Sequence, residues 1–371
     1  MTLEQQVANL VTETTALTSV VNSELNSVRS ENNTFKQSTL SSLDAVVANK
    51  VRGSGFTIYV NNQSGSANPV NPIDNSLAPF DTIARATSFL SSYKWDGTVV
   101  IKLSPGVHLV SGQIYLDKIT SYIKIEGAST PVFSGVEAIV SLTTLANKDS
   151  NSSVIGSNSS LFDHLSAIYQ SHIVTLSTNY AAFNVINSKL ILSNCFVYCQ
   201  EKQLNINIQG IGMVGWGSSD ISINNCAFMY FRYGLIVKNQ ASFSLSGNCI
   251  CSANVYPIGM AELARLYTDI SSILRVSGNL YSGISSSSAI TSIVSNCIAS
   301  ANGSHGFESS NGANITLWGC SAKNNGGYGF YITNAGIILS LGPDINNTGN
   351  VAGKKFENNA FQGYVLGVSA T

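Results

Sequence analysis

The sequence predicts a mainly β chain whose short strands stack into a long solenoid, preceded by an α-helical coiled coil. Three observations support this prediction: a repeat marked by cysteines, a heptad pattern over residues 1–50, and a composition poor in charge. Only 11% of the 371 residues are charged. Ser and Asn together form about a quarter of the chain, an excess over ordinary composition. Small neutral polar residues of this kind can solvate the surface of an elongated β structure.

The charge and hydropathy patterns exclude several classes of protein. With a formal net charge of −1, the chain lacks a basic surface for tracking phosphates, so we expect no nucleic-acid partner. No stretch approaches the ~18 uninterrupted apolar residues of a membrane span. Residues 1–6 lack the basic and apolar regions of a secretion signal. We therefore expect neither membrane insertion nor export.

The cysteines mark a repeat. The interval from Cys226 to Cys249 equals that from Cys297 to Cys320, and the interval from Cys249 to Cys297 is about twice as long. A Gly-Phe pair recurs with the same period at 306–307 and 329–330. A repeat of about 20–25 residues with short strands and Gly/Asn turns is typical of a stacked solenoid.

The same spacing argues that the cysteines are structural. At equivalent positions of successive coils their side chains would form an internal ladder, about 4.8 Å apart, whereas a metal or redox cluster needs thiolates that converge on one point. The count is odd and there is no pair of CxxC motifs, so we expect no disulfide framework, no metal and no cofactor. The seven are Cys195, Cys199, Cys226, Cys249, Cys251, Cys297 and Cys320.

Residues 1–52 have the pattern of a self-associating coiled-coil shaft. Thr14 and Asn32 fall on the apolar seam, where polar residues can fix register and strand number. The alternative is an amphipathic helix packed on its own domain, but a long helix with one narrow apolar stripe would find little there to pack against. The seam residues are Leu3, Val7, Leu10, Leu17, Val21, Leu25, Val28, Phe35 and Leu43.

The rest of the chain divides into three segments. Within residues 53–97 we expect a first strand over 56–60, a Gly/Asn/Pro-rich loop and a short amphipathic helix over about 79–90. Residues 98–345 predict the solenoid itself. We expect residues 346–371 to form a polar, Gly-rich exit segment without a large domain of its own.

Two motifs resemble a known family. The helical stretch from Pro79 to Ala86 (PFDTIARA) and the following GTVVIKLSPGVH at 97–108 resemble the opening of pectin-lyase-like right-handed parallel β-helices. Preceded by a coiled coil, they resemble the tail fibre and tailspike proteins of bacteriophages in particular. In that family the short helix caps the open end of the solenoid, which would otherwise expose strand edges and apolar interior.

The resemblance implies a function and a location. It implies a homotrimer in the virion tail, made in the host cytoplasm, whose N-terminal coiled coil meets tail or baseplate proteins and whose solenoid meets a bacterial surface polysaccharide. Three alternatives stay open: an adhesin that binds this glycan, a depolymerase that hydrolyses or eliminates it, and a structural baseplate or shaft component. We favour the adhesin because no recognisable large domain follows the last coil.

A depolymerase would need a pair of carboxylates about 5 to 9.5 Å apart. Glu201 and Asp220 flank one coil, while Glu262 and Asp269 fall in a predicted insertion over 252–272, with a short helix over 258–267. No spacing rule links the four. For Glu262 the alternative is an exposed helical pair with Arg265.

Aromatic residues are the other candidate site, because their faces can pack against sugar rings. We expect the insertion to project from the stack beside the turn that carries Trp216. Aromatic rings also stack inside β-helices, so a core role is the alternative for each. The glycan-binding candidates are Trp216, Tyr230, Tyr233, Tyr256 and Tyr267.

Overall fold

A computed structural model of the chain describes residues 2–52, 56–65, 79–119, 121–133, 159–176, 180–200, 210–288, 291–341, 347–357 and 364–366. The chain divides into two compact units, residues 1–52 and residues 53–371.

The first unit is a single long helix, α1 (Leu3–Lys50), followed by the short strand β1 (Val51–Arg52). The helix contains neither Gly nor Pro, which favours its 48-residue length. Thr2 and Gln5 cap its start: the Gln5 amide donates to Thr2 Oγ1 and the Thr2 amide donates to Gln5 Oε1. From Leu3 to Phe35 the predicted seam lies exposed along α1, with Leu17 64% and Phe35 70% exposed.

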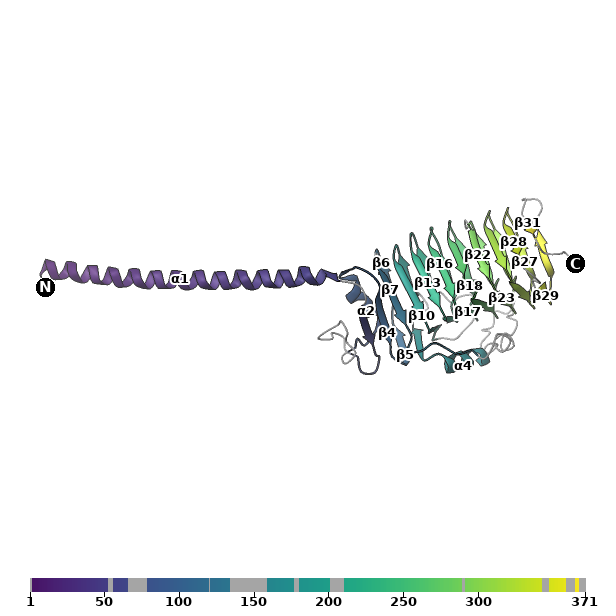
Figure 1. The fold of residues 1–371 in the computed structure, drawn as a ribbon, viewed down its shortest axis with the longest axis horizontal. Coiled ribbons are helices and arrows are strands. Elements are labelled where there is room, and N and C mark those ends of the chain that lie inside the picture. The colour runs from purple at the N-terminus through teal and green to yellow at the C-terminus, as the bar shows by residue number, and fades with distance from the viewer. Residues whose placement is uncertain are drawn as a thin grey trace. The chain divides into compact units, whose positions relative to one another are not determined.

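The second unit is a right-handed parallel β-helix, as predicted. Each coil contributes one strand to each of three parallel sheets, and the strands of successive coils lie side by side along the solenoid (Figure 1). Sheet 1 has 11 strands, and sheets 2 and 3 have nine each among the described residues. The strand β3 (Lys94–Trp95) precedes the first complete coil.

The strands of sheet 1 are β2 (Thr57–Val60), β4 (Val99–Leu103), β7 (Tyr122–Glu126), β10 (Lys189–Ser193), β13 (Asp220–Asn224), β16 (Ser242–Ser246), β19 (Arg265–Thr268), β22 (Thr291–Ser295), β25 (Asn314–Trp318), β28 (Ile337–Leu341) and β31 (Tyr364–Leu366). Those of sheet 2 are β5 (Gly106–Val110), β8 (Ser171–Thr175), β11 (Cys195–Cys199), β14 (Ala227–Met229), β17 (Asn248–Ser252), β20 (Ile273–Ser277), β23 (Cys297–Ser300), β26 (Ser321–Lys323) and β29 (Asn347–Thr348). Those of sheet 3 are β6 (Ile114–Asp117), β9 (Ala181–Ile186), β12 (Ile211–Trp216), β15 (Tyr233–Val237), β18 (Tyr256–Ala261), β21 (Ile284–Ser287), β24 (Phe307–Ser310), β27 (Tyr328–Ile332) and β30 (Gly353–Glu357).

The corners between sheets are made by residues with positive φ. Between sheet 1 and sheet 2 this position is an Asn or Gly just before the cysteine column, as at Asn194 (φ 57°) and Asn225 (φ 48°). Asn and Gly adopt this left-handed conformation at the lowest cost. The Asn-Cys repeat in the sequence is therefore a corner followed by an inward-facing strand residue.

The cysteine ladder is confirmed. The amide of Ile250 bonds to the carbonyl of Cys226, which places Cys249 beside Cys226, and Leu274 pairs with both Cys249 and Cys297. Leu274 thus fills the coil that lacks a cysteine in the longer interval. Cys199 and Cys251 lie outside this column, at other positions of β11 and β17. All seven cysteines are buried, and none is in a disulfide.

A second ladder, which the sequence analysis missed, runs along the corner between sheet 2 and sheet 3. In each of its coils an Asn, buried in all but the last, accepts a backbone amide from the coil before: the Asn279 amide donates to Asn302 Oδ1 at 3.2 Å, and the Asn302 amide donates to Asn325 Oδ1 at 3.1 Å. The side-chain amides bond to strand carbonyls, as Asn302 Nδ2 does to Val276 at 2.9 Å. The ladder consists of Asn254, Asn279, Asn302, Asn325 and Asn350.

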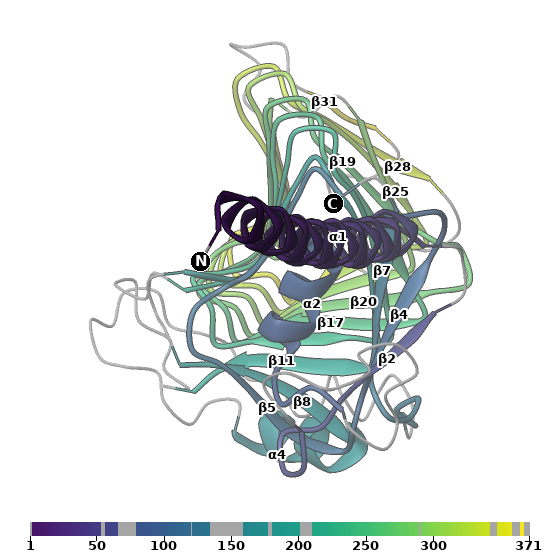
Figure 2. The ribbon, with the colours of Figure 1, turned by 90° about the vertical axis from the view of Figure 1, so that its left-hand side faces the viewer.

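The predicted capping helix is α2 (Ile83–Ser91). Thr82 is its N-cap and accepts the Arg85 amide at 3.3 Å. Its buried face, which includes Ile83, Ala86 and Leu90, joins the solenoid core. Viewed along the solenoid, α2 lies across the coils at their N-terminal end (Figure 2).

A segment between β7 and β8 was not predicted. It contains α4 (Ser159–Ile168), whose buried residues Leu161, Phe162 and Leu165 follow helical spacing. Phe162 packs on Phe196 at 5.4 Å, so α4 covers part of the outer face of sheet 2 (Figures 1 and 2).

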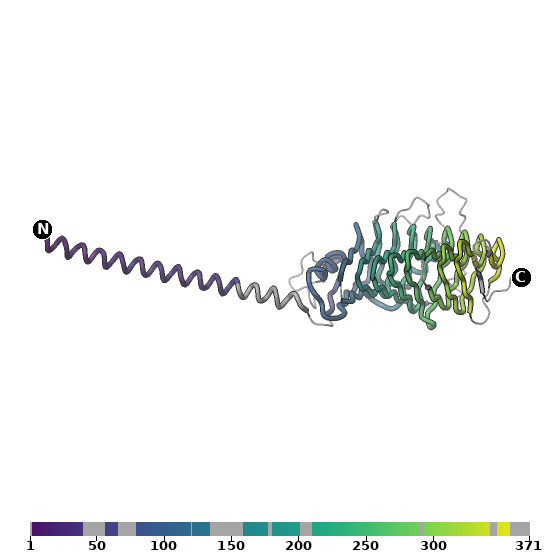
Figure 3. Tube along the Cα trace, turned by 90° about the horizontal axis from the view of Figure 1, so that it is seen from above, coloured from purple at the N-terminus to yellow at the C-terminus, as the bar shows by residue number. Residues whose placement is uncertain are grey.

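Two predictions were wrong. Residues 252–272 are not an insertion with a helix: they contain β18 and β19, which continue sheets 3 and 1. The solenoid also does not end at residue 345, because β29, β30 and β31 pair with the coil before them. Residues 252–272 therefore belong to the regular stack of coils, which continues toward the C-terminus (Figure 3).

The asparagine ladder should contribute strongly to stability. Asn302→Ala leaves the buried Asn279 amide without its partner and removes the side-chain bond to the Val276 carbonyl, so we expect the free energy of unfolding to fall by about 3 kcal/mol in urea denaturation. Asn184→Ala is the matched control, because this partly exposed side chain has one long bond, 3.4 Å, to Gln113. A loss as small as that of the control would contradict a supporting role for the ladder.

The cysteine column predicts alkaline instability. Burial raises the pKa of Cys249 from 9.0 to about 11 and that of Cys320 to about 12. The unfolded chain therefore releases these protons first, and the stability present below pH 9 should decline as the pH rises toward 11. Urea midpoints measured across this range should fall, and Cys249→Ala should make the decline shallower. An unchanged slope in that variant would show that other groups cause it.

Candidate functional site

The three outer faces of the solenoid differ in what they offer a ligand. The face of sheet 2 is partly covered by α4. Sheet 1 carries charged residues on its N-terminal strands, such as Lys102, Lys189 and Asp220. Sheet 3 carries partly exposed aromatic rings along several coils. We take the face of sheet 3 as the candidate functional site.

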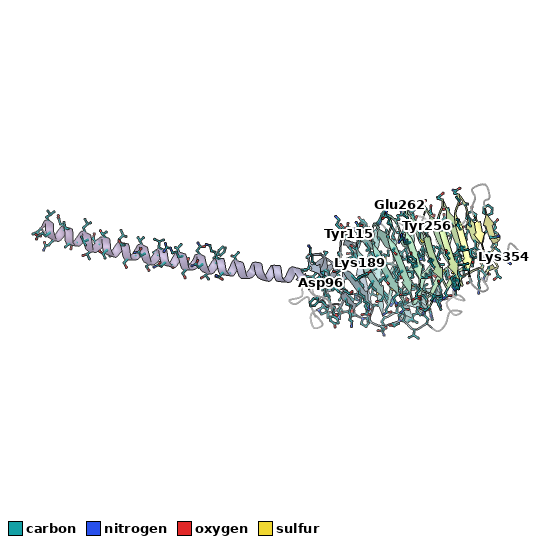
Figure 4. The ribbon with its side chains drawn as sticks, turned by 45° about the horizontal axis from the view of Figure 1, so that its top comes forward. Asp96, Tyr115, Lys189, Tyr256, Glu262 and Lys354 are labelled. Carbon is teal, nitrogen blue, oxygen red and sulfur yellow. The ribbon has the colours of Figure 1, made fainter. Side chains whose placement is uncertain are left out.

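A column of tyrosines lies where the strands of sheet 3 begin: Tyr233 and Tyr256 are the first residues of β15 and β18, and Tyr281 precedes β21. Tyr233 and Tyr256 are register partners with ring centroids 5.0 Å apart, and Tyr256 and Tyr281 stack at 4.6 Å with 5° between their planes. All three are partly exposed. Burial raises the pKa of Tyr256, and the neighbouring Tyr281, Tyr233 and Glu308 raise it further. Figure 4 labels Tyr256, at the start of β18, and Glu262, which follows the other end of that strand.

These rings differ from the platforms that the sequence analysis expected. Because the tyrosines stack face to face along the solenoid, most of their faces are occupied by one another. What remains exposed is ring edges and phenol hydroxyls, which suit hydrogen bonds to a ligand better than ring-on-ring packing.

A second aromatic group lies farther along sheet 3 and was not predicted. His305 and Tyr331 stack at 3.9 Å, and Tyr331 and Phe356 at 5.1 Å. Tyr328 lies 5.4 Å from Phe356. In the sequence, this group could have been recognised from Tyr328 and Tyr331. Both lie on one strand, and neither is part of the repeated Cys or Gly-Phe motif.

Small and polar residues separate the two aromatic groups. Gly259 pairs with Ser285, and Ser285 pairs with Glu308 on the next coil. Ser282 Oγ donates to Glu308 Oε2 at 2.7 Å. A Cβ added at Gly259 would meet nothing nearer than Tyr233, at 3.7 Å, so the strand is open to the outside here.

Trp216 lies at the end of β12, on sheet 3. It packs against a small outer cluster formed by Ala181, Val214 and Ile236. Lys238 Nζ lies 5.3 Å from the Trp216 ring centroid, an attractive cation–π arrangement. Trp216 is partly exposed, but no insertion lies beside it.

The remaining two aromatic candidates are not on this face. Tyr230 is 5% exposed and lies 5.7 Å from Phe162 of α4, so its predicted surface role was wrong. Burial raises the pKa of Tyr230 to about 12. Tyr267 is 37% exposed but lies on β19 of sheet 1. The sequence could not reveal either placement, because α4 covers Tyr230 from a distant segment and the insertion that joined Tyr267 to Tyr256 does not exist.

The described carboxylate candidates do not form a pair. Glu201 lies outside the described residues. Asp220, on sheet 1, accepts the Tyr122 hydroxyl, and this hydrogen bond raises the pKa of Tyr122. Glu262 forms a left-handed corner with Leu263 at φ 57° and 66°. Two coils separate the levels of Asp220 and Glu262, about 10 Å.

Asp269 has a structural role. It follows β19 at the corner between sheets 1 and 2, and its Oδ1 accepts the Ser271 amide at 3.0 Å. That bond and a further one from Ser271 lower the pKa of the Asp269 carboxyl. This is an Asx turn, which stabilises the corner.

A polar cavity of about 460 Å³ lies at the N-terminal coils, where sheet 1 turns into sheet 2. Tyr59, Lys102, Glu126 and Asn194 line it, so a phenol, an amine, a carboxylate and a carboxamide meet there. Lys124 Nζ pairs with Glu126 Oε1 at 2.7 Å. None of these groups was a predicted site residue.

Among the described residues no cluster of His, Cys, Asp or Glu could hold a metal ion. The helices in the described part of the chain are each too short or too polar to cross a membrane.

A family model agrees with the fold of the C-terminal part of the solenoid. Residues 209–370 match a family model described as "Right handed beta helix region". No curated protein matches the sequence. A crystal structure of the Dettilon tailspike protein is similar over 76% of this chain and 48% of its own, with 11% identity and a TM-score of 0.45. ORF18 of Geobacillus virus E2 is similar over 84% of this chain and 62% of its own, with 10% identity and a TM-score of 0.35. The chain thus spans about half of the first and under two thirds of the second.

Proposed function

We propose that this protein is an oligomeric bacteriophage tail fibre protein that binds a bacterial surface glycan through the outer face of sheet 3. The motifs at 79–86 and 97–108, which resemble those of phage β-helix proteins, support the class. The observation that carries the binding role is the row of partly exposed tyrosines beside Glu308, with open backbone between the two aromatic groups.

The chemistry of this face fits a neutral or weakly charged polysaccharide. Sugar hydroxyls can donate to the Glu308 carboxylate and exchange hydrogen bonds with the tyrosine hydroxyls. A sugar ring over Gly259 and Ser285 would meet the strand without a large side chain between them. Because repeated coils present similar groups in a row, the face matches a ligand that also repeats.

The exposed seam of α1 supports assembly. A helix whose Leu, Val and Phe side chains face water is stabilised when other copies bury them. The family resemblance implies three strands. We further propose that α1 docks onto tail or baseplate proteins, which places the protein in the virion.

Degradation of the same glycan is the second candidate function. The polar cavity supports it, because Glu126, Lys102 and Tyr59 supply acid and base groups in one place. Release of oligosaccharides from host capsule or lipopolysaccharide, lost in Glu126→Gln, would favour this candidate over an adhesin. Failure of the protein to bind host cells at all would favour a structural shaft component.

The tyrosine column should be required for glycan binding. Tyr256→Ala combined with Glu308→Gln removes the central ring and the carboxylate, so we expect at least a tenfold loss of affinity, about 1.4 kcal/mol. Binding would be measured on immobilised bacterial polysaccharides. Because the ligand contacts are mostly neutral, affinity for the parent protein should change little between low and high salt.

Tyr180→Ala is the control for this experiment, since Tyr180 is 55% exposed but precedes β9, several coils away. Equal losses in the control and the double variant, or no loss in either, would remove the sheet 3 face from consideration.

The exposed seam predicts an oligomer. Light scattering should return a multiple of the mass of one chain, three times that mass if the family resemblance holds. Deleting residues 1–50 should weaken assembly because it removes the seam. A full-length chain that remains monomeric at micromolar concentration would contradict both the shaft and the fibre.

A further inference from the structure

The outer face of sheet 1 changes character along the solenoid. From β4 to β19 its outward positions include six charged residues: Lys102, Lys124, Glu126, Lys189, Asp220 and Arg265. From β22 to β28 the described outward residues are all uncharged, and most are apolar: Ile293, Asn314, Thr316, Trp318, Ile337, Leu339 and Leu341.

The apolar residues of these three strands form one patch. Ile293 pairs with Thr316 and Thr316 with Leu339, while Trp318 pairs with Leu341. Ile293 is 40% exposed, Trp318 43% and Leu341 36%. Tyr267, one coil earlier, is in register with Ile293 and extends the patch. Large apolar side chains that are exposed together mark an interaction surface.

We propose that this patch, Tyr267, Ile293, Trp318, Ile337, Leu339 and Leu341, is where copies of the chain pack against one another along their solenoids. The inference deepens the proposed fibre, and so rests on it, by naming the contact surface between subunits. It adds a second self-association surface to the seam of α1.

The absence of charge on the described part of the patch fits a copy of the same chain. When copies are related by rotation about an axis along the solenoid, each coil meets the same coil of its neighbour. A Lys or Glu on such a face would approach its own equivalent, which is unfavourable. Neutral apolar residues avoid this conflict.

The composition of the patch fits a protein partner better than a glycan. Ile, Leu and Trp bury apolar area, and Trp and Tyr are enriched at interface centres. The patch lacks the carboxylate and phenol cluster of sheet 3. The two faces therefore divide the roles: sheet 3 for the ligand, and the C-terminal strands of sheet 1 for the neighbouring copy.

Disulfide cross-linking in the full-length protein tests the interface. All seven native cysteines are buried, so a cysteine introduced on the surface is the reactive one. Leu341→Cys places a thiol in the patch, where equivalent residues of two copies come together. Ser285→Cys, on sheet 3, is the control on another face. Leu17→Cys, in the seam of α1, reports separately whether the helices associate.

After mild oxidation we expect most Leu341→Cys and Leu17→Cys chains to migrate as covalent dimers without reductant, and at least tenfold less dimer for Ser285→Cys. Cross-linking of Leu17→Cys without Leu341→Cys would overturn the interface and leave the fibre standing. No cross-link at either position would overturn both. Equal cross-linking of Leu341→Cys and Ser285→Cys would show random collision and also overturn the interface.

A charge placed in the patch gives a second test of the interface, and an uncharged variant at the same position controls for loss of folding. In the Leu341→Cys background, Ile293→Glu should reduce the dimer at least tenfold, because carboxylates of neighbouring copies would meet at one level. Ile293→Gln, which has the same shape without the charge, should retain most of the dimer. Equal yields from the two variants would contradict a symmetric contact at Ile293.

Discussion

Hydrogen bonding between each coil and the next is the constraint on which the rest of this structure depends. Parallel strands pair at every level of the three sheets, and the corners fix how the coils align. Residues of positive φ turn the chain, and the buried ladder from Asn254 to Asn350 ties each corner to its neighbour through amide bonds of 2.9 to 3.2 Å. A shift of one residue in any coil would break these bonds and reverse the strand faces.

Because the register is fixed, similar residues come to lie above one another inside and outside the solenoid. Inside, this produces the column of Cys195, Cys226 and Cys249, whose small apolar side chains are all buried. Outside, the same rule stacks Tyr233 on Tyr256. A row of like groups is thus a direct consequence of the fold, and on sheet 3 it creates a surface suited to a repeating ligand.

The differences between the faces come from elements outside the regular coil. The segment with α4 packs on sheet 2 and against Tyr230, at the end of β14. The C-terminal strands of sheet 1 have no such cover among the described residues, so Trp318 and Leu341 stay exposed in a single chain. Covered, ligand-facing and subunit-facing surfaces can therefore coexist on one solenoid.

The sequence by itself determined the period, the cysteine column, the capping helix and the long helix of residues 1–50, because each depends on local spacing or conformational preference. It misjudged residues 252–272, where Glu262 and Leu263 look helical but form a left-handed corner between two strands. Only the tertiary structure decided which of three faces each residue occupies. A repeat tells which residues are neighbours along the axis, whereas exposure depends on what distant segments cover, and the faces of stacked rings are hidden by the next coil.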